Sequence, residues 1–425
     1  MDRAVPSRRT LLAGTGGLAL AGSAAADAAG LENDAFMAWL YVLPLIEMAG
    51  VRARLSERGN DGRTLPSNTM VHAPGLASPQ SRAVTAPNRD TLYSVALIDL
   101  TAGPVGLVLP ETGQRYVSVA VFDMYTDAGI VVGTRTTGGK GGRFRIIGPG
   151  QSARDDRDLR LATPHGWLLL RVLSGRQSDV PVGYASRSSP WPAYFRSAQR
   201  LLESDPPTFK AGLDSVERLR RAGSRGDFDD AGYDAAQVRA IEAGVARARA
   251  LVEQGARTTK FTDGWSDPPP GLGAFGDQYV YRALVAVAGI GALPREEAMY
   301  LRSAGDDGAG LFRGDGLYRL QLTKPVPVQG FWSMTMYEAT PDGQFFLSQN
   351  SIGRYAIGER TRGLVRGADG SLDIWIGRQD PGGARSANWL PAPASGPFSL
   401  TFRAYLPEPA LQSGAYRLPP VKKVA

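Results

Sequence analysis

Two β-prone runs that lie far apart in the chain share one pattern, and this pattern constrains the fold more than any other feature. Residues 116–123 read Tyr-Val-Ser-Val-Ala-Val-Phe-Asp, and they align without gaps with residues 331–338, Phe-Trp-Ser-Met-Thr-Met-Tyr-Glu. Upstream of the two runs, in the same order, Asp90-Thr-Leu-Tyr93 matches Asp315-Gly-Leu-Tyr318. Because internal similarity on the scale of a domain indicates a repeated unit, we predict a duplicated β domain with the two runs in equivalent strands.

The other predicted elements follow from turn residues and apolar spacing. Short β-prone runs predict strands at 92–98, 105–109, 144–147, 167–173, 317–322, 372–376 and 398–405. Apolar residues at helical spacing predict a helix at 31–55, which Pro44 should kink or interrupt. A second helical region spans 191–252, and its best part begins at Asp234, which with Gln237 resembles a capping box.

These elements predict a mainly β protein with α insertions. We expect two antiparallel β-sandwich or jelly-roll-like domains, a helical N-terminal segment and a helical insert. The expected divisions are a signal peptide at 1–28, an N-terminal domain at 29–185, the helical insert with a linker at 186–276, and a C-terminal β domain at 277–425.

The N-terminus is typical of an export signal. Arg8 and Arg9 precede an apolar, glycine-rich segment, and small residues follow at Ser23-Ala-Ala-Ala26. This order predicts a cleavable twin-arginine signal and a periplasmic or secreted protein, with the twin-arginine machinery as a partner. The segment is too short and glycine-rich for a membrane anchor, and we expect no membrane span in the mature chain.

Composition narrows the ligands and cofactors. The net charge of +7 is spread along the 425 residues without runs of like charge, which disfavours nucleic acid and favours anionic small molecules or glycans. The chain has no cysteine and two histidines, so disulfides and thiolate chemistry are excluded and no zinc site is expected. We expect no cofactor, although an oxygen-ligated cation at Asp90, Asp123 and Asp127 stays open beside solvated carboxylates. A homo-oligomer also stays open.

The first candidate site is the polar segment 86–94, Ala-Pro-Asn-Arg-Asp-Thr-Leu-Tyr-Ser, at the entrance of a predicted strand. Asn88 and Arg89 are candidate ligand-binding residues, and Asp90 and Tyr93 are candidate catalytic residues. His72 lies just upstream and is a candidate general base. The alternatives are a polar turn that bonds its own backbone and a histidine satisfied in the core.

A second group of candidates lies elsewhere in the chain. Arg135, Asn350 and Arg354 have side chains that recognise a carboxylate, and the phenol of Tyr355 can exchange a proton. The alternative for Arg354 is a structural ion pair, for example with Glu359.

Two tryptophans and an amide complete the candidate ligand-binding residues. Trp332 and Trp389 have rings that can stack on sugars, although tryptophan at strand spacing more often belongs to the core. Asn388 either caps a turn or contacts a ligand. No nucleophile elbow, phosphate loop or dinucleotide fingerprint occurs in a suitable context.

The chain resembles a bacterial family that pairs an N-terminal domain of unknown function 1254 with a C-terminal domain of unknown function 1214. Several motifs agree in order over nearly all of the mature chain. The resemblance implies an exported protein built largely of β-sandwich domains with a helical insert, and it implies no reaction. The motifs are Pro87–Ser94, Phe122–Tyr125, Gly133–Thr137, Gly330–Ser333, Asn350, Arg354–Gly358, Ser386–Ala392, Gly396–Leu400 and Pro419–Val424.

Two hypotheses for the function follow. The first is a cofactor-independent acid–base enzyme (a lyase, isomerase or hydrolase) that acts on an anionic small molecule or glycan. The second is a non-catalytic periplasmic binding or assembly module whose polar motifs join the domains. The enzyme requires the candidate residues around one cavity, whereas the second hypothesis places them in satisfied pairs.

The twin arginines give the first testable prediction. Replacing both Arg8 and Arg9 by Lys should leave the protein in the cytoplasm with its signal uncut, because the receptor reads the arginine pair. Cell fractionation and the mass of the product measure this. Normal processing of the double variant would refute the assignment.

Overall fold

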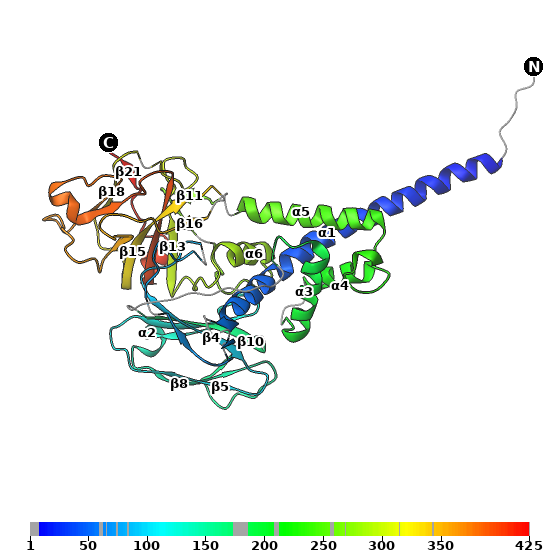
Figure 1. Cartoon of the computed structure of the whole chain (residues 1–425), viewed down its shortest axis with the longest axis horizontal. Coiled ribbons are helices and arrows are strands. Elements are labelled where there is room, and N and C mark those ends of the chain that lie inside the picture. Colours follow the sequence, from blue (N-terminus) through cyan, green and yellow to red (C-terminus); the bar gives the residue numbers. More distant parts are fainter. Residues whose placement is uncertain are drawn as a thin grey trace, which may run out of the picture.

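The computed structural model describes residues 8–425 except 59–62, 65, 74, 83–84, 173–185, 208–211, 256–258, 268, 314, 342–343 and 425, and for 8–27, 57–58 and 63–64 it describes the backbone alone. Figure 1 shows three parts: a helical part, an N-terminal β unit and a C-terminal β unit. Short elements outside these parts or at their edges are β1 (Glu57–Arg58), β2 (Arg63–Thr64), β11 (Phe261–Thr262), β12 (Trp265–Ser266), α2 (Thr134–Thr137), η1 (Asp230–Gly232), η2 (Gly383–Asn388) and α7 (Pro409–Gln412).

The N-terminal β unit consists of two sheets packed face to face. The larger sheet has the order β3-β4-β10-β6-β7 and the smaller one β5-β8-β9. Apolar side chains of both sheets, among them Ile98, Leu107 and Val119, form one buried core. β6 is buried along its whole length, because both of its faces are covered. The strands are β3 (Val71–His72), β4 (Leu92–Asp99), β5 (Val105–Leu109), β6 (Val117–Asp123), β7 (Ile130–Gly133), β8 (Gly142–Ile147), β9 (Asp158–Arg160) and β10 (His165–Val172).

The C-terminal β unit is also made of two facing sheets. The first has the order β13-β20-β15-β16, with β17 also paired to β15, and the second has the order β19-β18-β14-β21. Trp332, Phe402 and Ile374 belong to the core between them. The strands are β13 (Ala298–Arg302), β14 (Tyr318–Leu322), β15 (Val328–Ala339), β16 (Phe345–Phe346), β17 (Ala356–Gly358), β18 (Leu372–Gly377), β19 (Trp389–Pro391), β20 (Phe398–Pro407) and β21 (Lys422–Lys423).

The two β units share one strand order. The run β4-β10-β6-β7 corresponds to β13-β20-β15-β17, and β5-β8-β9 corresponds to β14-β18-β19. In each smaller sheet the last pair, β8–β9 or β18–β19, is parallel. β6 and β15, which carry the two aligned runs, occupy corresponding places, as predicted. No sheet of the described residues closes into a barrel, and the jelly-roll topology stays a prediction.

The second sequence match, between Asp90–Tyr93 and Asp315–Tyr318, is wrong. Tyr93 lies at the start of β4 in the larger sheet of its unit, whereas Tyr318 begins β14 in the smaller sheet of the other. The strand that corresponds to β4 is β13, which contains Tyr300. A Leu-Tyr pair at the start of a strand is too short a pattern to distinguish these places.

The helical part is organised around α1 (Arg8–Ser56). α3 (Trp191–Ser204), α4 (Leu213–Ala222), α5 (Ala235–Gly255) and α6 (Tyr279–Ala288) surround it. Their apolar faces share one core with that of α1. Because helices cover about as many residues as strands, the fold is mixed α/β and not mainly β. The main cause is α1, which continues the predicted signal segment into the predicted 31–55 helix without a break.

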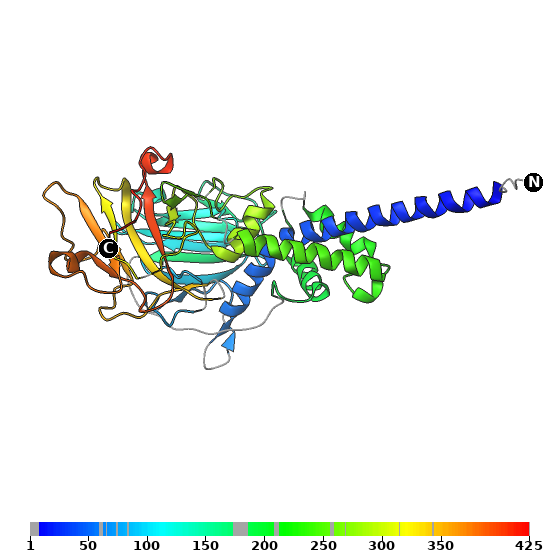
Figure 2. The same cartoon turned by 90° about the horizontal axis from the view of Figure 1, so that it is seen from above.

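Two sequence expectations about α1 need correction. The helix is continuous through Pro44, so the proline does not interrupt it, although Figure 2 shows a bend in the half nearer the β units. We expected no later segment suited to cross a membrane, yet Ala28–Ser56 has the length and apolar composition of a span. The most apolar 18 residues of that segment are 72% buried inside the structure, as in the core helix of a folded domain.

The predicted capping box begins α5. The carboxylate of Asp234 accepts the backbone N–H of Gln237 at 2.9 Å, and the side-chain oxygen of Gln237 accepts the backbone N–H of Asp234 at 2.9 Å. The face that contains Ile241, Val245 and Ala248 is buried against α1. The prediction of this helix from its cap and its apolar spacing is therefore confirmed.

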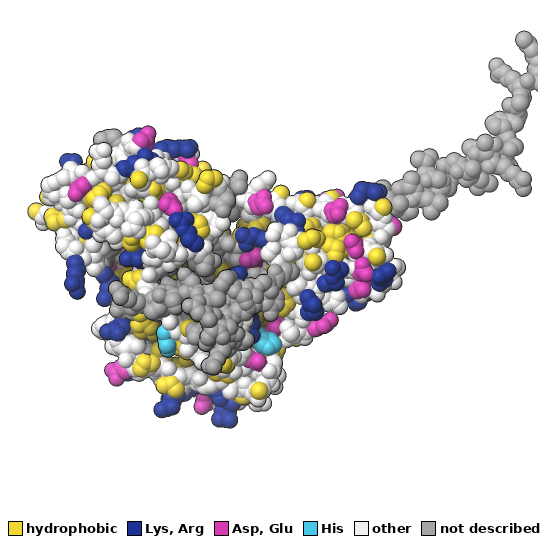
Figure 3. All heavy atoms as spheres, in the orientation of Figure 1, with side chains coloured by type: hydrophobic (Ala, Val, Ile, Leu, Met, Phe, Trp, Pro, Cys, Tyr) yellow, Lys and Arg dark blue, Asp and Glu magenta, His cyan; other side chains and the backbone are white. Residues whose placement is uncertain are grey.

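The two β units meet through their larger sheets. Tyr116 and Phe122 of the N-terminal unit share a core with Phe331 and Tyr405 of the C-terminal unit. The end of α1, including Met48, packs into the same core. This surface, where all three parts meet, places the side chains described below; the space-filling view in Figure 3 shows the outside of the same three parts.

Gly244 gives a stability prediction, because α5 approaches α1 closely there. A Cβ at this position would lie 2.2 Å from the backbone oxygen of Glu32. Gly244→Ala should therefore lower the free energy of unfolding by about 1–3 kcal/mol, although alanine is the better helix former. Gly30→Ala in α1 is the control, because a Cβ added there would have nothing within 4 Å; chemical denaturation should show no loss there. Equal effects of the two substitutions would contradict the close approach.

Candidate functional site

The predicted polar segment 86–94 lies at the contact between the two β units. Asn88 Oδ1 accepts the backbone N–H of Asp90 at 2.7 Å, which is the turn of the simpler alternative. Asn88 Nδ2, however, donates to the phenol oxygen of Tyr405 on β20 at 2.6 Å. Asp90 Oδ2 accepts the hydroxyls of Ser333 at 2.7 Å and Tyr405 at 2.8 Å. The segment therefore connects the N-terminal unit to the C-terminal sheet.

Next to this segment, each of the two facing sheets has a tyrosine, an arginine and a serine side by side on adjacent strands. A carboxylate residue precedes each tyrosine by three positions: Asp90 in the first unit and Glu297 in the second. The strand registers define an N-terminal row, Tyr93–Arg171–Ser118, and a C-terminal row, Tyr300–Arg403–Ser333.

Arg403, in the C-terminal row, is buried and bonded through both terminal nitrogens, whereas its Nε has no hydrogen-bond partner and no carboxylate lies within ion-pair distance of it among the described residues. Its Nη1 donates to Thr335 Oγ1 at 2.9 Å, and its Nη2 donates to the phenol oxygen of Tyr337 at 2.8 Å. Burial acts to lower the pKa of Arg403, but Tyr337, Tyr405 and the carboxylate of Asp90 outweigh burial, so the pKa lies above its usual value. Asp90 thus supplies a nearby negative charge for this cation.

Arg171, in the N-terminal row, is equally buried, with 4% of its surface exposed. Its Nη2 donates to the backbone oxygen of Gly291 at 2.5 Å, whereas its Nη1 has no hydrogen-bond partner among the described residues. The guanidinium lies 5.4 Å from the ring centre of Tyr93, whose phenol also hydrogen-bonds to the guanidinium. Burial acts to lower the pKa of Arg171, but neighbouring phenols outweigh it and the pKa lies above its usual value. Arg171 is a cation without a carboxylate partner within ion-pair distance among the described residues.

Glu297, the carboxylate of the second unit, is bound by another arginine. Arg135 Nε donates to Glu297 Oε2 at 2.5 Å, and the Glu297 side chain is 1% exposed. Glu297 Oε1 also accepts the phenol of Tyr116 at 3.1 Å. Arg135 therefore joins the two β units. Its ion pair involves Glu297, the carboxylate three positions before Tyr300 of the C-terminal row.

Arg89, Tyr355 and His72 lie around the same segment but outside the two rows. The Arg89 guanidinium stacks on the Tyr355 ring, 4.5 Å from its centre, and donates to the backbone oxygen of Ala77. Burial lowers the pKa of Arg89. His72 is exposed on β3 and its Nδ1 lies 2.7 Å from the hydroxyl of Ser94.

The two candidate tryptophans are buried. Trp332 belongs to the core of the C-terminal unit and stacks on Phe402 with ring centres 5.2 Å apart. Trp389 is 6% exposed and its indole N–H donates to the backbone oxygen of Gly377 at 2.9 Å. Asn388 holds the backbone of Val365 through both of its amide atoms, at 2.8 and 2.6 Å. The two tryptophans therefore pack as core residues, and Asn388 binds backbone groups, as the structural alternatives to ligand binding require.

Arg354 and Asn350 order two loops. Arg354 Nη1 donates to the backbone oxygens of Ala387 at 3.0 Å and Trp389 at 2.7 Å. Arg354 therefore binds these carbonyl oxygens and not Glu359, the partner considered in the sequence analysis. Asn350 caps its own loop, since Oδ1 accepts the N–H of Arg354 at 3.1 Å and Nδ2 donates to its carbonyl oxygen at 3.0 Å. The hydrogen-bond acceptors of the Arg354 side chain are thus backbone carbonyl oxygens.

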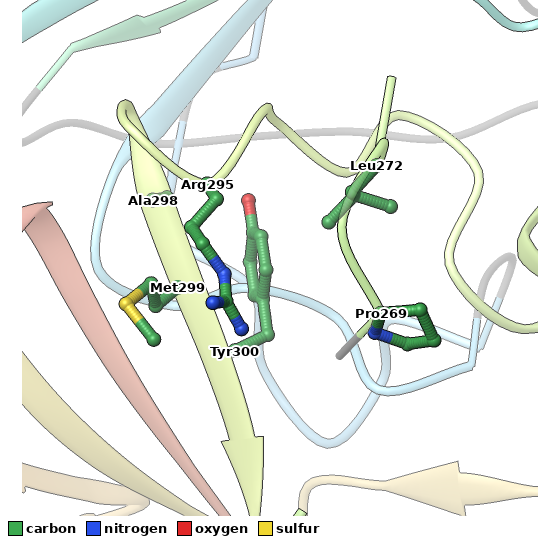
Figure 4. A pocket seen from close by; sticks show the side chains of 6 residues that line it. All are labelled: Pro269, Leu272, Arg295, Ala298, Met299 and Tyr300. Atoms are coloured by element: carbon green, nitrogen blue, oxygen red, sulfur yellow. The ribbon is translucent and has the colours of Figure 1, made fainter. Parts of the chain in front are cut away.

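A shallow pocket of about 190 Å³, counted out to open solvent, lies beside the C-terminal row (Figure 4). Figure 4 shows the Tyr300 ring next to the Arg295 side chain, with Leu272 and Pro269 across from them. The lining residues are Pro269, Leu272, Arg295, Ala298, Met299 and Tyr300. None of the candidate residues predicted from sequence lines this pocket.

Family models match both β units. The model described as a protein of unknown function, DUF1254, matches residues 67–187, and that described as a protein of unknown function, DUF1214, matches residues 297–409. The chain belongs to the family that has an N-terminal DUF1254 domain and a C-terminal DUF1214 domain. No curated protein matches the chain.

A solved structure agrees with the fold of this DUF1254–DUF1214 protein. The crystal structure of the VPA0106 protein from Vibrio parahaemolyticus has a TM-score of 0.64 and 21% identity, over 93% of this chain and 100% of that one. An uncharacterized protein from Burkholderia cenocepacia has a TM-score of 0.44 and 14% identity, over 95% and 97%. At 21% identity, the likeness to the Vibrio protein shows a shared fold alone.

The carboxylates considered for a cation lie in two places of the DUF1254 domain. Asp90 is part of the contact described above, whereas Asp123 and Asp127 lie together at the end of β6. Asp123 Oδ1 accepts the backbone N–H groups of Tyr125 at 2.8 Å and Asp127 at 2.9 Å. Arg282 of α6 donates to Asp127 Oδ2 at 2.9 Å. The positive group beside Asp123 and Asp127 is therefore the guanidinium of Arg282.

Sequence reasoning missed Arg171, Arg403, Tyr405 and Glu297. Two signals were available. One is an arginine inside a strand that is otherwise apolar, as in Leu168-Leu-Leu-Arg-Val172 and Leu400-Thr-Phe-Arg-Ala404. The other is that Glu297-Ala-Met-Tyr300 repeats the spacing of Asp90-Thr-Leu-Tyr93. This is the match that the strand order supports.

Asp123 gives a prediction on pH. Burial, followed by the charge of Asp127, raises the pKa of Asp123 from 3.8 to about 7. Between these values the folded protein holds a proton that the unfolded chain has released, so stability should fall as the pH rises from about 4 to about 7. Asp123→Asn should flatten this dependence, which has a slope of at most about 1.4 kcal/mol per pH unit. Denaturation curves over this pH range measure the effect.

Asp156→Asn is the control for this measurement, because Asp156 is exposed. The control variant should keep the pH dependence of the wild type. An unchanged pH dependence in Asp123→Asn would show that Asp123 is ionised in the folded state.

Proposed function

We propose that this protein binds a small organic anion at the contact between its two β units, with Arg171 as the cationic anchor. The observation that carries the proposal is the buried Arg171 guanidinium, which has an unbonded Nη1 and no carboxylate partner within ion-pair distance among the described residues. A buried ion without a counterion costs several kcal/mol. A bound carboxylate would supply both the missing charge and the missing hydrogen-bond acceptor.

The surroundings of Arg171 do not supply this charge themselves. Glu297 is paired with Arg135 at 2.5 Å. Tyr116 and Tyr300 lie near Arg171, but burial raises the pKa of both phenols, so they are neutral at physiological pH. Neutral phenols are hydrogen-bond donors, and together with a guanidinium they are suited to a carboxylate.

The contacts favour binding over acid–base catalysis. At the contact between the units, the Tyr405 phenol donates to the carboxylate of Asp90 at 2.8 Å. Burial and the charge of Asp90 raise the pKa of Tyr405 well above its usual value, so it does not serve as a base near neutral pH. His72 is exposed and bonded to Ser94. An acid–base enzyme that uses these groups is therefore the less favoured of the two functions.

The N-terminal helix and the likeness of the two β units add two further inferences to this proposal. We infer that the N-terminal helix begins as a twin-arginine signal, which would place the binding protein in the periplasm or outside the cell. We also infer that the two β units are duplicated sandwiches. Their shared strand order and the paired Tyr–Arg–Ser rows support this duplication.

Arg171→Met gives the test of the binding site. A panel of small mono- and dicarboxylates, uronic acids and inorganic phosphate is added to the wild-type protein, and thermal unfolding is measured. At least one organic anion should stabilise the protein, by about 2.7 kcal/mol at a concentration of 100 Kd. Arg171→Met should lose this response because it removes the anchoring charge, and Arg171→Lys should keep part of it.

Arg143→Met is the matched control, because Arg143 is exposed on β8, in the smaller sheet. This variant should respond to the anion as the wild type does. The proposal is overturned if no anion of the panel stabilises the wild type, or if folded Arg171→Met responds fully.

A further inference from the structure

We propose that the outer face of the β19-β18-β14-β21 sheet binds an acidic polysaccharide, with Trp375 as its central contact. Figure 1 shows β18 and β21 on the side of the C-terminal unit that is turned away from the N-terminal unit. The face is thus separate from the proposed site at Arg171. It is an interaction surface, and the proposal does not depend on anion binding between the units.

The residues of this face alternate with the core along each strand. In β18, Ile374 and Ile376 are buried, whereas Trp375 between them is partly exposed. In β14, Leu320 is buried and Arg319 is partly exposed. Side chains of period two point to the same face, so Trp375 and Arg319 both face outward.

The strand registers align four large side chains across this face. Lys422 of β21 pairs with Arg319, Arg319 pairs with Trp375, and Trp375 pairs with Trp389 of β19. Neighbouring strands lie about 4.8 Å apart, so two cations and two indole groups follow one another along one line. Trp389 is buried, and Trp375 is the indole that a ligand can reach.

The charge of this line is positive. The exposed Arg385 places its guanidinium 4.6 Å from the Trp375 ring centre, and Arg319 lies 5.6 Å from it. Asp373 forms an ion pair with Arg319 at 2.9 Å. This leaves Lys422 and Arg385 without an ion-pair partner among the described residues. Both guanidinium groups lie over the Trp375 ring, so the ring and the cations form one surface that complements a sugar chain carrying carboxylates.

The corresponding sheet of the N-terminal unit shows that the fold does not require these residues. At the same level of β5-β8-β9 the paired residues are Gly106, Arg145 and Asp158. There the two charged residues form an ion pair with each other. The two indoles of the C-terminal sheet therefore stand where the N-terminal sheet has an ion pair, and Trp375, the partly exposed one, adds an aromatic surface to the outer face.

Binding to de-esterified polygalacturonate tests the proposal, with affinity electrophoresis of the full mature chain as the measurement. The wild type should be retarded, and the retardation should weaken with salt because exposed charges are screened. Trp375→Ala should lower the affinity about tenfold or more, as for an aromatic hot spot. Arg385→Ala should lower it severalfold with the fold intact, because Arg385 is exposed.

Controls distinguish this surface from other binding. Arg143→Ala, at an exposed position of the corresponding sheet, should bind polygalacturonate as the wild type does. Neutral dextran and polyglutamate should not be bound, since the first lacks charge and the second lacks sugar rings. The proposal is overturned if folded Trp375→Ala and Arg385→Ala bind like the wild type. Equal binding of dextran, polyglutamate or single-stranded DNA would also overturn it.

Discussion

The arrangement of the molecule depends on one apolar contact, in which the larger sheet of each β unit packs against that of the other. Tyr116, Phe331 and Tyr405 form its aromatic centre, with Phe331 and Tyr405 stacked at 4.3 Å between ring centres. The end of α1 is buried in the same core, so the helical part is fixed to both units. Because apolar burial is not directional, the polar groups around this centre set the register of the two sheets. Asp90 does so by accepting hydrogen bonds from Ser333 and Tyr405 across the contact.

Sequence patterns predicted most of the elements, because local rules decide them. Period-two alternation identified β15, and the capping box at Asp234 identified α5. The extent of α1 was underestimated, since a proline and an expected cleavage region both suggested a shorter helix. The twin-arginine route and the domain boundaries stay predictions. The face of a strand that meets another domain has the same alternation as a face that meets its own core, so the contact between the units was not predictable from period alone.

The candidate site was predictable only in part, for a related reason. Segment 86–94 and Arg135, both named as candidates from the sequence, lie at the contact between the units. Trp332, Asn388 and Arg354 instead have structural partners. An isolated side chain in a sequence does not reveal whether its partner is a backbone carbonyl or a ligand. The arginines of the two rows were missed because a single charge in an apolar strand was not weighed against the cost of burying it.

Unequal use of the two carboxylates accounts for the asymmetry of the contact. Each unit supplies a Tyr–Arg–Ser row and a carboxylate three positions before its tyrosine. Asp90 reaches across to Ser333 and lies near enough to Arg403 to raise its pKa. Glu297 is held by Arg135 at 2.5 Å, so it does not serve Arg171 in the same way. Neither arginine has a carboxylate within ion-pair distance among the described residues. Arg403 donates from both terminal nitrogens, whereas Nη1 of Arg171 has no partner there, and for this reason we place the proposed anion at the N-terminal row.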